Sequence, residues 1–255
     1  MIHPTAIVDS SAEIAGDVEI GPYCIVEGGV RIGAGSRLES HVVVQGNTVI
    51  GEGCTVSPFA SIGGPPQDIG YKYEPTRVVI GRNNTIKEYV TINRGTMKGG
   101  GVTEVGENNF IMAYAHIAHD CKVGNNIIMA NGATLAGHVE VSDFVIFSGL
   151  CAVHQFCRVG KYAFISGLTG IPKDVPPFVI AAGDRAKLYG LNLVGLERRN
   201  FSKDEIMKLK KAYRILFRSA LPLTTSLKII REELDGDNIG YLIEFIESST
   251  RGICR

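Results

Sequence analysis

The chain has 255 residues, 45% of them hydrophobic, and its 26 basic residues balance 26 acidic ones. A neutral chain has no overall field that would draw it to nucleic acid, and no apolar run approaches the ~20 residues that a membrane-spanning helix needs. The N-terminus lacks the basic segment and apolar core of a secretory signal. We therefore expect a cytoplasmic protein with no nucleic-acid partner and no membrane span.

Apolar residues recur every six positions through the first two thirds of the chain. The series runs from Ile2 to Ile62 without a miss, resumes at Ile80, and restarts one residue out of phase at Val105 to continue to Ile171. Glycine often follows the apolar residue, where it turns the chain at low conformational cost. Helices and simple amphipathic strands have other periods. The pattern is typical of a parallel β-helix with apolar side chains stacked inward.

The number of repeats predicts the size of this β-helix. Twenty-six positions fit the period, and three repeats per coil would give nearly nine coils. At ~4.8 Å per coil the prism would be about 40 Å long. Five of the six cysteines occupy the small, inward fifth position of a repeat, which predicts reduced packing residues and no zinc site.

Two segments interrupt the period. Residues 63–79, "GGPPQDIGYKYEPTRVV", are rich in turn formers, and residues 96–104, "TMKGGGVTE", are rich in glycine. Loops on a rigid scaffold commonly carry binding groups, although a surface bulge without a role is the plain alternative.

The C-terminal part follows a helical pattern. We expect a β-helix domain over residues 1–183 and a helical domain over residues 184–255, with Ser202 and Glu205 forming a capping box. Further helices fit residues 226–234 and 239–248. Between Glu197 and Arg218, eight Lys or Arg residues face three acidic ones. This basic patch is either a solvated helix face or a dock for an acidic partner.

The stretch "AHIAHDC" holds the groups best suited to chemistry. His116, His119 and Asp120 fall at outward positions of their repeats, and His138 and His154 follow at coil-scale distances near the same edge. His116 and His119 lie about a corner apart, which disfavours convergence on one metal ion. A histidine followed by an aspartate suits a general base with an orienting carboxylate.

The motifs taken together resemble a known family. "PQD", "RGT", "AHIAHDC", "TLAGHVEV", "AVHQFCRVG", "KDVPPFVIAAGD" and "STRGICR" span nearly the whole chain. The sequence resembles the UDP-N-acetylglucosamine O-acyltransferases that begin lipid A biosynthesis. The resemblance implies a left-handed β-helix and a homotrimer with its clefts between neighbouring prisms. It also implies transfer of a (R)-3-hydroxyacyl group from acyl carrier protein to the 3-hydroxyl of UDP-N-acetylglucosamine.

The resemblance also assigns roles to residues. His119 matches the general base, Asp120 its orienting carboxylate, and the Gly137 N–H the donor to the oxyanion. Gly167 matches a residue that stops the acyl chain. The matching substrate-binding residues are Gln67, Asp68, His116, His138, His154, Gln155, Asn192, Arg198 and Arg199. No metal or cofactor is implied.

Two positions depart from the family pattern. Many members read "QDLKY" where this chain reads "QDIGY", so Gly70 replaces a lysine that the nearby Lys72 could substitute. Val194 stands at a position that is acidic in the family. Both positions concern the sugar nucleotide, so an acceptor with a 3-amino group stays open, as does the acyl chain length.

Three alternatives come from other classes. The N-acyltransferase of the same pathway generally has an extra N-terminal uridine-binding domain, whereas the repeats start here at residue 2. A trimeric β-helix carbonic anhydrase would bind zinc through three histidines, which a zinc assay would detect. A purely structural prism would give no reason for the outward histidines or the basic patch.

Overall fold

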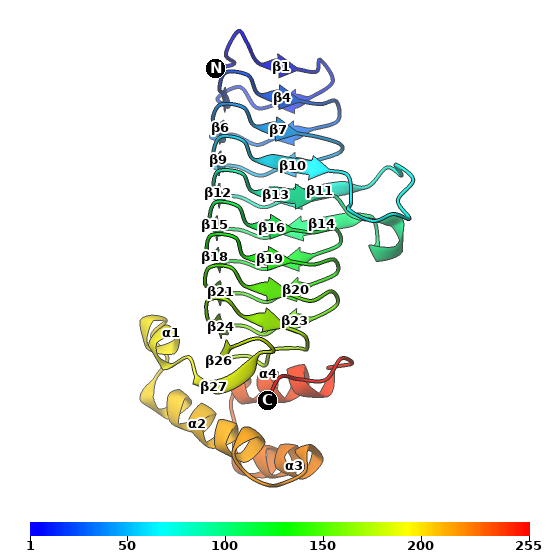
Figure 1. Ribbon diagram of the computed structural model, residues 1–255. Helices are drawn as coiled ribbons and strands as arrows, with labels where there is room; N and C mark the ends of the chain where they lie inside the picture. The colour runs from blue at the N-terminus through cyan, green and yellow to red at the C-terminus, as the bar shows by residue number, and fades with distance from the viewer.

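The computed structural model describes residues 1–255 and forms a three-sided prism with helices at its C-terminal end (Figure 1). Each coil contributes one short strand to each of three sheets, and strands from successive coils pair in parallel. The mainly β fold class expected from the period is confirmed: a left-handed parallel β-helix of hexapeptide repeats, followed by a helical region.

The three sheets are named here in the order in which the chain enters them. The first sheet contains β1 (Ile7–Val8), β4 (Ile25–Val26), β7 (Val43–Val44), β10 (Ser61–Gly64), β13 (Thr91–Asn93), β16 (His116–Ile117), β19 (Thr134–Leu135), β22 (Ala152–Val153) and β25 (Gly170–Ile171). The second contains β2 (Glu13–Ile14), β5 (Arg31–Ile32), β8 (Val49–Ile50), β11 (Arg77–Ile80), β14 (Val102–Val105), β17 (Lys122–Val123), β20 (Glu140–Val141) and β23 (Arg158–Val159).

The third sheet contains β3 (Glu19–Ile20), β6 (Arg37–Leu38), β9 (Thr55–Val56), β12 (Thr85–Ile86), β15 (Phe110–Ile111), β18 (Ile128–Met129), β21 (Ile146–Phe147), β24 (Phe164–Ile165), β26 (Val179–Ala182) and β27 (Lys187–Leu191). The second residue of most two-residue strands points inward, and such residues as Ile62, Ile117 and Leu135 are fully buried. All six cysteines are buried and unpaired, as expected.

The chain turns at three edges. The first edge joins the first sheet to the second and contains Asp120, the second edge joins the second to the third and contains Phe144, and the third edge closes the coil and contains Tyr114. These residues have φ values of 60°, 61° and 63°. Residues other than glycine rarely adopt this left-handed backbone conformation. Hydrogen bonds to the previous coil hold it, as in the 2.9 Å bond from the Phe144 N–H to the Asn125 carbonyl.

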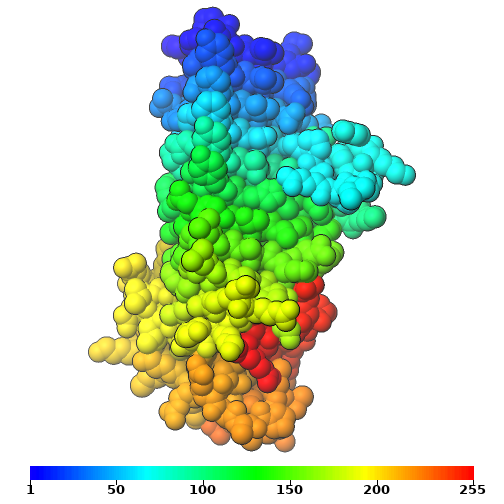
Figure 2. Space-filling view, in the orientation of Figure 1, coloured from blue at the N-terminus to red at the C-terminus, as the bar shows by residue number.

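Both interruptions of the period leave the prism at the first edge (Figure 1). Residues 65–76 connect β10 to β11 and project from the column in the space-filling view (Figure 2). Residues 94–101 connect β13 to β14 and contain the short helix η1 (Met97–Gly99). We call these segments the first and second insertions. They stand over the edge that carries Asp120.

The C-terminal region contains α1 (Leu193–Arg198), α2 (Lys203–Phe217), α3 (Leu223–Glu233) and α4 (Asp237–Glu247). Ser202 and Glu205 form the expected capping box, and the apolar face of α2 is buried. The helical pattern expected from about Asp184 is wrong for β27, which pairs antiparallel with β26 and caps the last coil. The boundary at residue 183 stays a prediction. None of the four helices has the length and apolar character to cross a membrane.

Candidate active site

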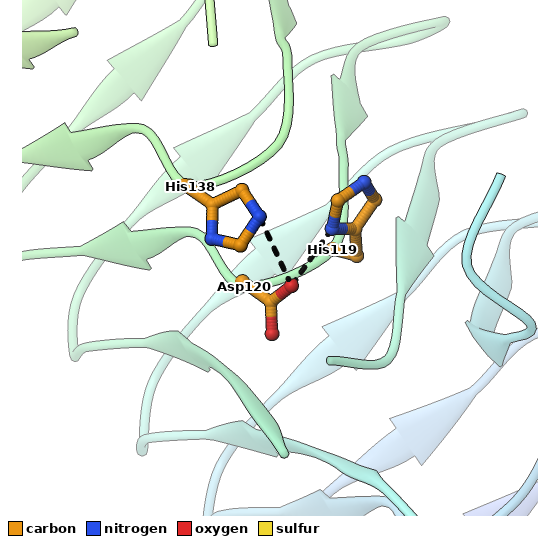
Figure 3. Close-up of side chains that lie close together, drawn as sticks. All are labelled: His119, Asp120 and His138. Atoms are coloured by element: carbon orange, nitrogen blue, oxygen red, sulfur yellow. Dashed lines mark hydrogen bonds and ion pairs between the residues drawn. The ribbon is translucent and has the colours of Figure 1, made fainter. Parts of the chain in front are cut away.

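The corner between β16 and β17 places His119 beside Asp120 on the first edge (Figure 3). The His119 Nδ1 lies 2.8 Å from the Asp120 Oδ2, and the Asp120 side chain is 1% exposed, against 16% for His119. A carboxylate only accepts, so Nδ1 carries the proton and Nε2 keeps its lone pair. The pair has the geometry of a histidine base with an orienting carboxylate.

Asp120 is held by two threonines that sequence reasoning did not single out. The Thr96 N–H donates to Oδ1 and the Thr96 hydroxyl to Oδ2, both at 2.7 Å. The Thr103 hydroxyl accepts from the Asp120 N–H at 2.8 Å. Both carboxylate oxygens therefore have donors although water is excluded. The "RGT" motif contains Thr96 and could have drawn attention to it. Its distance of 24 residues from Asp120 in the sequence gave no reason to expect a contact between the two.

His138 and His116 flank this pair. The His138 Nε2 lies 3.5 Å from the Asp120 Oδ2, and its ring meets that of His119 edge-on with centroids 5.1 Å apart (Figure 3). Burial lowers the pKa of His138, with the charge of Asp120 acting in the opposite direction. Burial also lowers the pKa of His116, whose Nδ1 lies 2.7 Å from the Thr91 hydroxyl. Both rings are therefore neutral near pH 7.

His119 and His138 meet at one edge, as their coil-scale spacing predicted. Nitrogen and oxygen atoms of His119, Asp120 and His138 lie within 4.8 Å of one another. His116 lies in the same coil as His119 and stays outside this cluster, whereas His138 comes from the next coil. Both oxygens of Asp120 accept hydrogen bonds from Thr96, so the buried carboxylate has partners within the chain.

Gly137 lies one coil below His119. A Cβ at this position would lie 2.5 Å from the His119 Cε1, so a side chain here would displace the ring. Gly137 is buried, and its N–H donates to no group of the chain. A free N–H beside a histidine base is available to a bound oxyanion.

The first insertion brings Gln67 and Asp68 toward this edge. Gln67 is exposed, while Asp68 is partly buried, accepts from the Gly70 N–H at 2.8 Å, and acts electrostatically on His138. The proposed substitute Lys72 is exposed, and its N–H donates to the Glu74 carboxylate at 2.9 Å.

His154 and Gln155 lie on the first edge between β22 and β23, and both are exposed. The His154 Nδ1 is 3.2 Å from the Gln155 carbonyl and 3.2 Å from the Arg251 Nη2. A carbonyl accepts and a guanidinium donates, so Nδ1 serves one of them at a time. Arg251, in the "STRGICR" tail, was not singled out from the sequence, yet it reaches this edge.

The second edge carries a different kind of site. A cavity of about 690 Å³ is lined mainly by apolar side chains, among them Phe144, Tyr162 and Val194, with Arg198 and Arg199 at its border. The Arg199 guanidinium carbon lies 4.6 Å from the centre of the Phe144 ring.

Asn192 also lines this cavity, but its amide is engaged in the fold. Its Oδ1 caps α1 by accepting from the Gly195 N–H at 3.1 Å, and its Nδ2 donates to the Tyr162 carbonyl at 2.9 Å. The cavity therefore offers an apolar wall with two cationic side chains, while Asn192 shapes the wall. Such a surface suits a flat ring with a phosphate group attached.

Comparison with known proteins decides the family. Residues 174–254 match the model for UDP N-acetylglucosamine O-acyltransferase, domain 2, and residues 29–64 and 103–137 match bacterial transferase hexapeptide repeats. A relative from Thermodesulfovibrio yellowstonii, named as an acyl-carrier-protein-dependent UDP-N-acetylglucosamine O-acyltransferase, is 58% identical over all of this chain and 99% of its own. The chain belongs to this O-acyltransferase family.

Other relatives agree with this O-acyltransferase assignment. A namesake from Janthinobacterium is 51% identical and covers all of this chain and 99% of its own. The solved structure of Francisella novicida UDP-N-acetylglucosamine acyltransferase superposes with a TM-score of 0.97 at 44% identity, covering all of this chain and 94% of that one. The resemblance read from the motifs is confirmed, and the N-acyltransferase, carbonic anhydrase and structural readings are set aside.

In this O-acyltransferase, Gly167 lies on the third edge between β24 and β25. It is exposed, and a Cβ there would meet nothing closer than the Gly149 carbonyl at 3.5 Å. The first edge and the third edge border the same sheet, whose outward residues shrink from one coil to the next. They pair in the order His116, Thr134, Ala152 and Gly170. From Thr134 to Gly170 the outward face of this sheet therefore carries no bulky side chain on the way toward Gly167.

Proposed function

We propose that the chain transfers a (R)-3-hydroxyacyl group from acyl carrier protein to the 3-hydroxyl of UDP-N-acetylglucosamine, the first step of lipid A biosynthesis. The observation that carries this proposal is the buried carboxylate of Asp120 against the His119 Nδ1. It leaves the Nε2 lone pair as the base for a hydroxyl proton.

The reaction follows from this arrangement. Nε2 takes the proton of the sugar 3-hydroxyl while its oxygen attacks the thioester carbon of the carrier-bound acyl group. Asp120 stabilises the imidazolium that forms, because its charge lies 2.8 Å from Nδ1. The free N–H of Gly137 donates to the tetrahedral oxyanion. The intermediate then expels the carrier thiolate, which receives the proton from His119, and the ester remains on the sugar.

The substrate-binding roles rest on position. Asp68 and Gln67 of the first insertion, with the neutral His116 and His138, would hold the sugar near His119. His154 and Gln155 lie further along the same edge, toward the acyl path. The second-edge cavity would take the uridine, with Arg198 and Arg199 near the diphosphate. We place the enzyme in the cytoplasm, as the sequence predicted.

A homotrimer would unite the two halves of the site. His119 is on the first edge and the arginine cavity on the second, so the two halves belong to different edges of one prism. The third edge presents a ladder of rings whose centroids are 4.8 to 5.1 Å apart, namely Tyr23, His41, Phe59, Tyr89 and Tyr114. Exposed aromatic stripes are typical of subunit contacts. With the third edges at a threefold axis, the first edge of one prism would meet the second edge of the next.

The experiment offers competing substrates to the purified protein. UDP-N-acetylglucosamine and its 3-amino analogue are mixed with 3-hydroxyacyl carriers of several lengths, and products are identified by mass spectrometry. We expect an ester on the 3-oxygen. An amide as the main product would move the proposal to the 3-amino acceptor. The absence of both the ester and the amide would overturn it.

A further inference from the structure

The second insertion is fastened to the catalytic carboxylate through Thr96. The Thr96 hydroxyl donates to the Asp120 Oδ2, the oxygen that also accepts from the His119 Nδ1. The Thr96 N–H donates to the other oxygen, and the hydroxyl itself accepts from the Gly99 N–H at 3.2 Å. Thr96 is 5% exposed. Every hydrogen-bonding group of this threonine side chain is therefore committed to the site.

A carboxylate removed from water stays ionised only if donors replace the lost hydration. Two donors from Thr96 act on Asp120, one on each oxygen, which fixes the plane of the group. The fixed plane keeps Oδ2 facing the His119 Nδ1 at 2.8 Å, while His138 stays at 3.5 Å. Without the hydroxyl, the carboxylate would be poorer in donors and free to turn toward His138.

Gly99 gives independent support for this contact. A Cβ at Gly99 would overlap the carboxyl carbon of Asp120, so the loop can cover the carboxylate only with glycine there. Gly100 and Gly101 follow with φ values of 92° and 80°, which favour glycine. The glycine run that interrupts the hexapeptide period is what allows the second insertion to close over Asp120.

We propose that Thr96 is a positioning residue for acyl transfer. It holds the Asp120 carboxylate turned toward His119, so that His119 keeps its proton on Nδ1 and its lone pair on Nε2. This proposal rests on the proposed function, since it concerns the same base.

The test compares Thr96→Val, which keeps the shape and the backbone donor but loses the hydroxyl, with Thr96→Ser, which keeps the hydroxyl. For Thr96→Val we expect turnover roughly ten- to a hundredfold lower with little change in KM for the sugar nucleotide. Losing the donor favours the protonated form of the His119–Asp120 pair. In the pH profile of kcat/KM, the midpoint of the fall on the acid side (the acid limb) should therefore shift to a pH higher by about half a unit to one unit. Thr96→Ser should stay near wild type.

Thr103→Val is the matched control, because Thr103 is buried and its hydroxyl bonds to the backbone N–H of Asp120 and not to the carboxylate. It should lower the melting temperature without moving the acid limb. The same limb shift in both valine variants, or none in Thr96→Val, would overturn the proposal. If Thr96→Val is too unstable, Thr96→Ala is read in the same way. A wild-type protein without acyl transfer would instead refute the proposed function.

A separate observation concerns Lys98 in the same insertion. A Cβ built at Gly70 would lie 3.8 Å from the Lys98 Nζ and 3.3 Å from the Asp68 Oδ1. Lys98 is exposed and forms no ion pair within 4 Å. Its ammonium thus occupies the space that a side chain at position 70 would enter, beside a predicted sugar-binding aspartate.

We infer that Lys98, rather than Lys72, supplies the cation that Gly70 lacks toward the sugar nucleotide. Lys98→Gln should raise KM for the sugar nucleotide roughly tenfold, the loss of one charge-assisted hydrogen bond. Lys72→Gln should leave it unchanged. Gly70→Lys combined with Lys98→Gln should restore binding, because Gly70 has no left-handed φ and its tightest contact is with a side-chain oxygen, the Asp68 Oδ1 at 3.3 Å from the new Cβ, which needs to move only slightly. Equal effects of the two single variants, or no rescue, would overturn the inference.

Discussion

The first and second edges of the prism share a backbone and differ in chemistry. Asp120 and His138 turn the chain at the first edge with φ of 60° and 61°, and Phe144 and Tyr162 turn it at the second with φ of 61° and 60°. At the first edge these corners hold a hydrogen-bonded network under two insertions. At the second they stack in register, with ring centroids 4.8 Å apart, beside an arginine-bordered cavity. The repeat therefore sets the backbone, and the corner side chains set the function.

The largest effect is expected from removing the base of the first edge. His119→Ala should reduce turnover by roughly two to four orders of magnitude, as is typical when a general base is lost. The melting temperature should change little, because the ring lies outside the core. Steady-state assays with the acyl carrier and the sugar nucleotide measure the loss.

His3→Ala, an exposed histidine in the first coil, is the control and should match wild type. Near-normal turnover of His119→Ala would show that the first edge is not where the proton is removed.

The next effect concerns the third edge and the length of the acyl chain. Gly167→Met should shift preference toward shorter carriers, because the side chain would fill the open space beside Gly149. Each excluded methylene forfeits about 0.8 kcal/mol of burial, or about fourfold in kcat/KM. A carrier series measures the optimum. An unchanged optimum would place the end of the acyl path elsewhere.

The smallest effect is expected at the basic patch on α2. Lys208 lies 2.6 Å from Asp235 and Lys211 2.7 Å from Glu233, so these two charges are already paired within the chain. Lys210 and Arg214 are exposed and form no ion pair with an acidic side chain. Reversing Lys210 and Arg214 to Glu should weaken carrier binding several-fold, most at low salt.

Lys211→Glu is the matched control, which should lose its ion pair and change carrier affinity less. The affinity of the sugar nucleotide should not move in either variant. Equal effects of the free and paired positions on carrier binding would assign the patch to solvation.

The sequence predicted the prism well because each coil repeats one local rule. Period, turn residues and inward apolar positions all act within six residues, and the capping box of α2 is equally local. β27 was missed because pairing with β26 overrode its local pattern. Counting repeats could have shown that both insertions leave the same edge, since β10 and β13 occupy one sheet.

The candidate site was predicted residue by residue, but its connections were not. His119 and Asp120 are adjacent in sequence, so their pairing could be expected. The contacts of Asp120 with Thr96 and of Gly137 with His119 depend on the path of an insertion and on the vertical register of two coils. Neither follows from residue spacing within one repeat.

The proposed trimer joins the first edge of one prism to the second edge of its neighbour. The direct test mixes two inactive chains, His119→Ala and the double variant Arg198→Ala, Arg199→Ala, each with its own affinity tag. Assemblies that carry both tags are purified and assayed for acyl transfer. The His119→Ala chain keeps its second edge intact, and the arginine double variant keeps its first edge intact. A trimer that contains both chains therefore always has one site in which both edges are intact. We expect about one third of wild-type activity. Activity no higher than that of the two separate variants would show that each site lies within one chain.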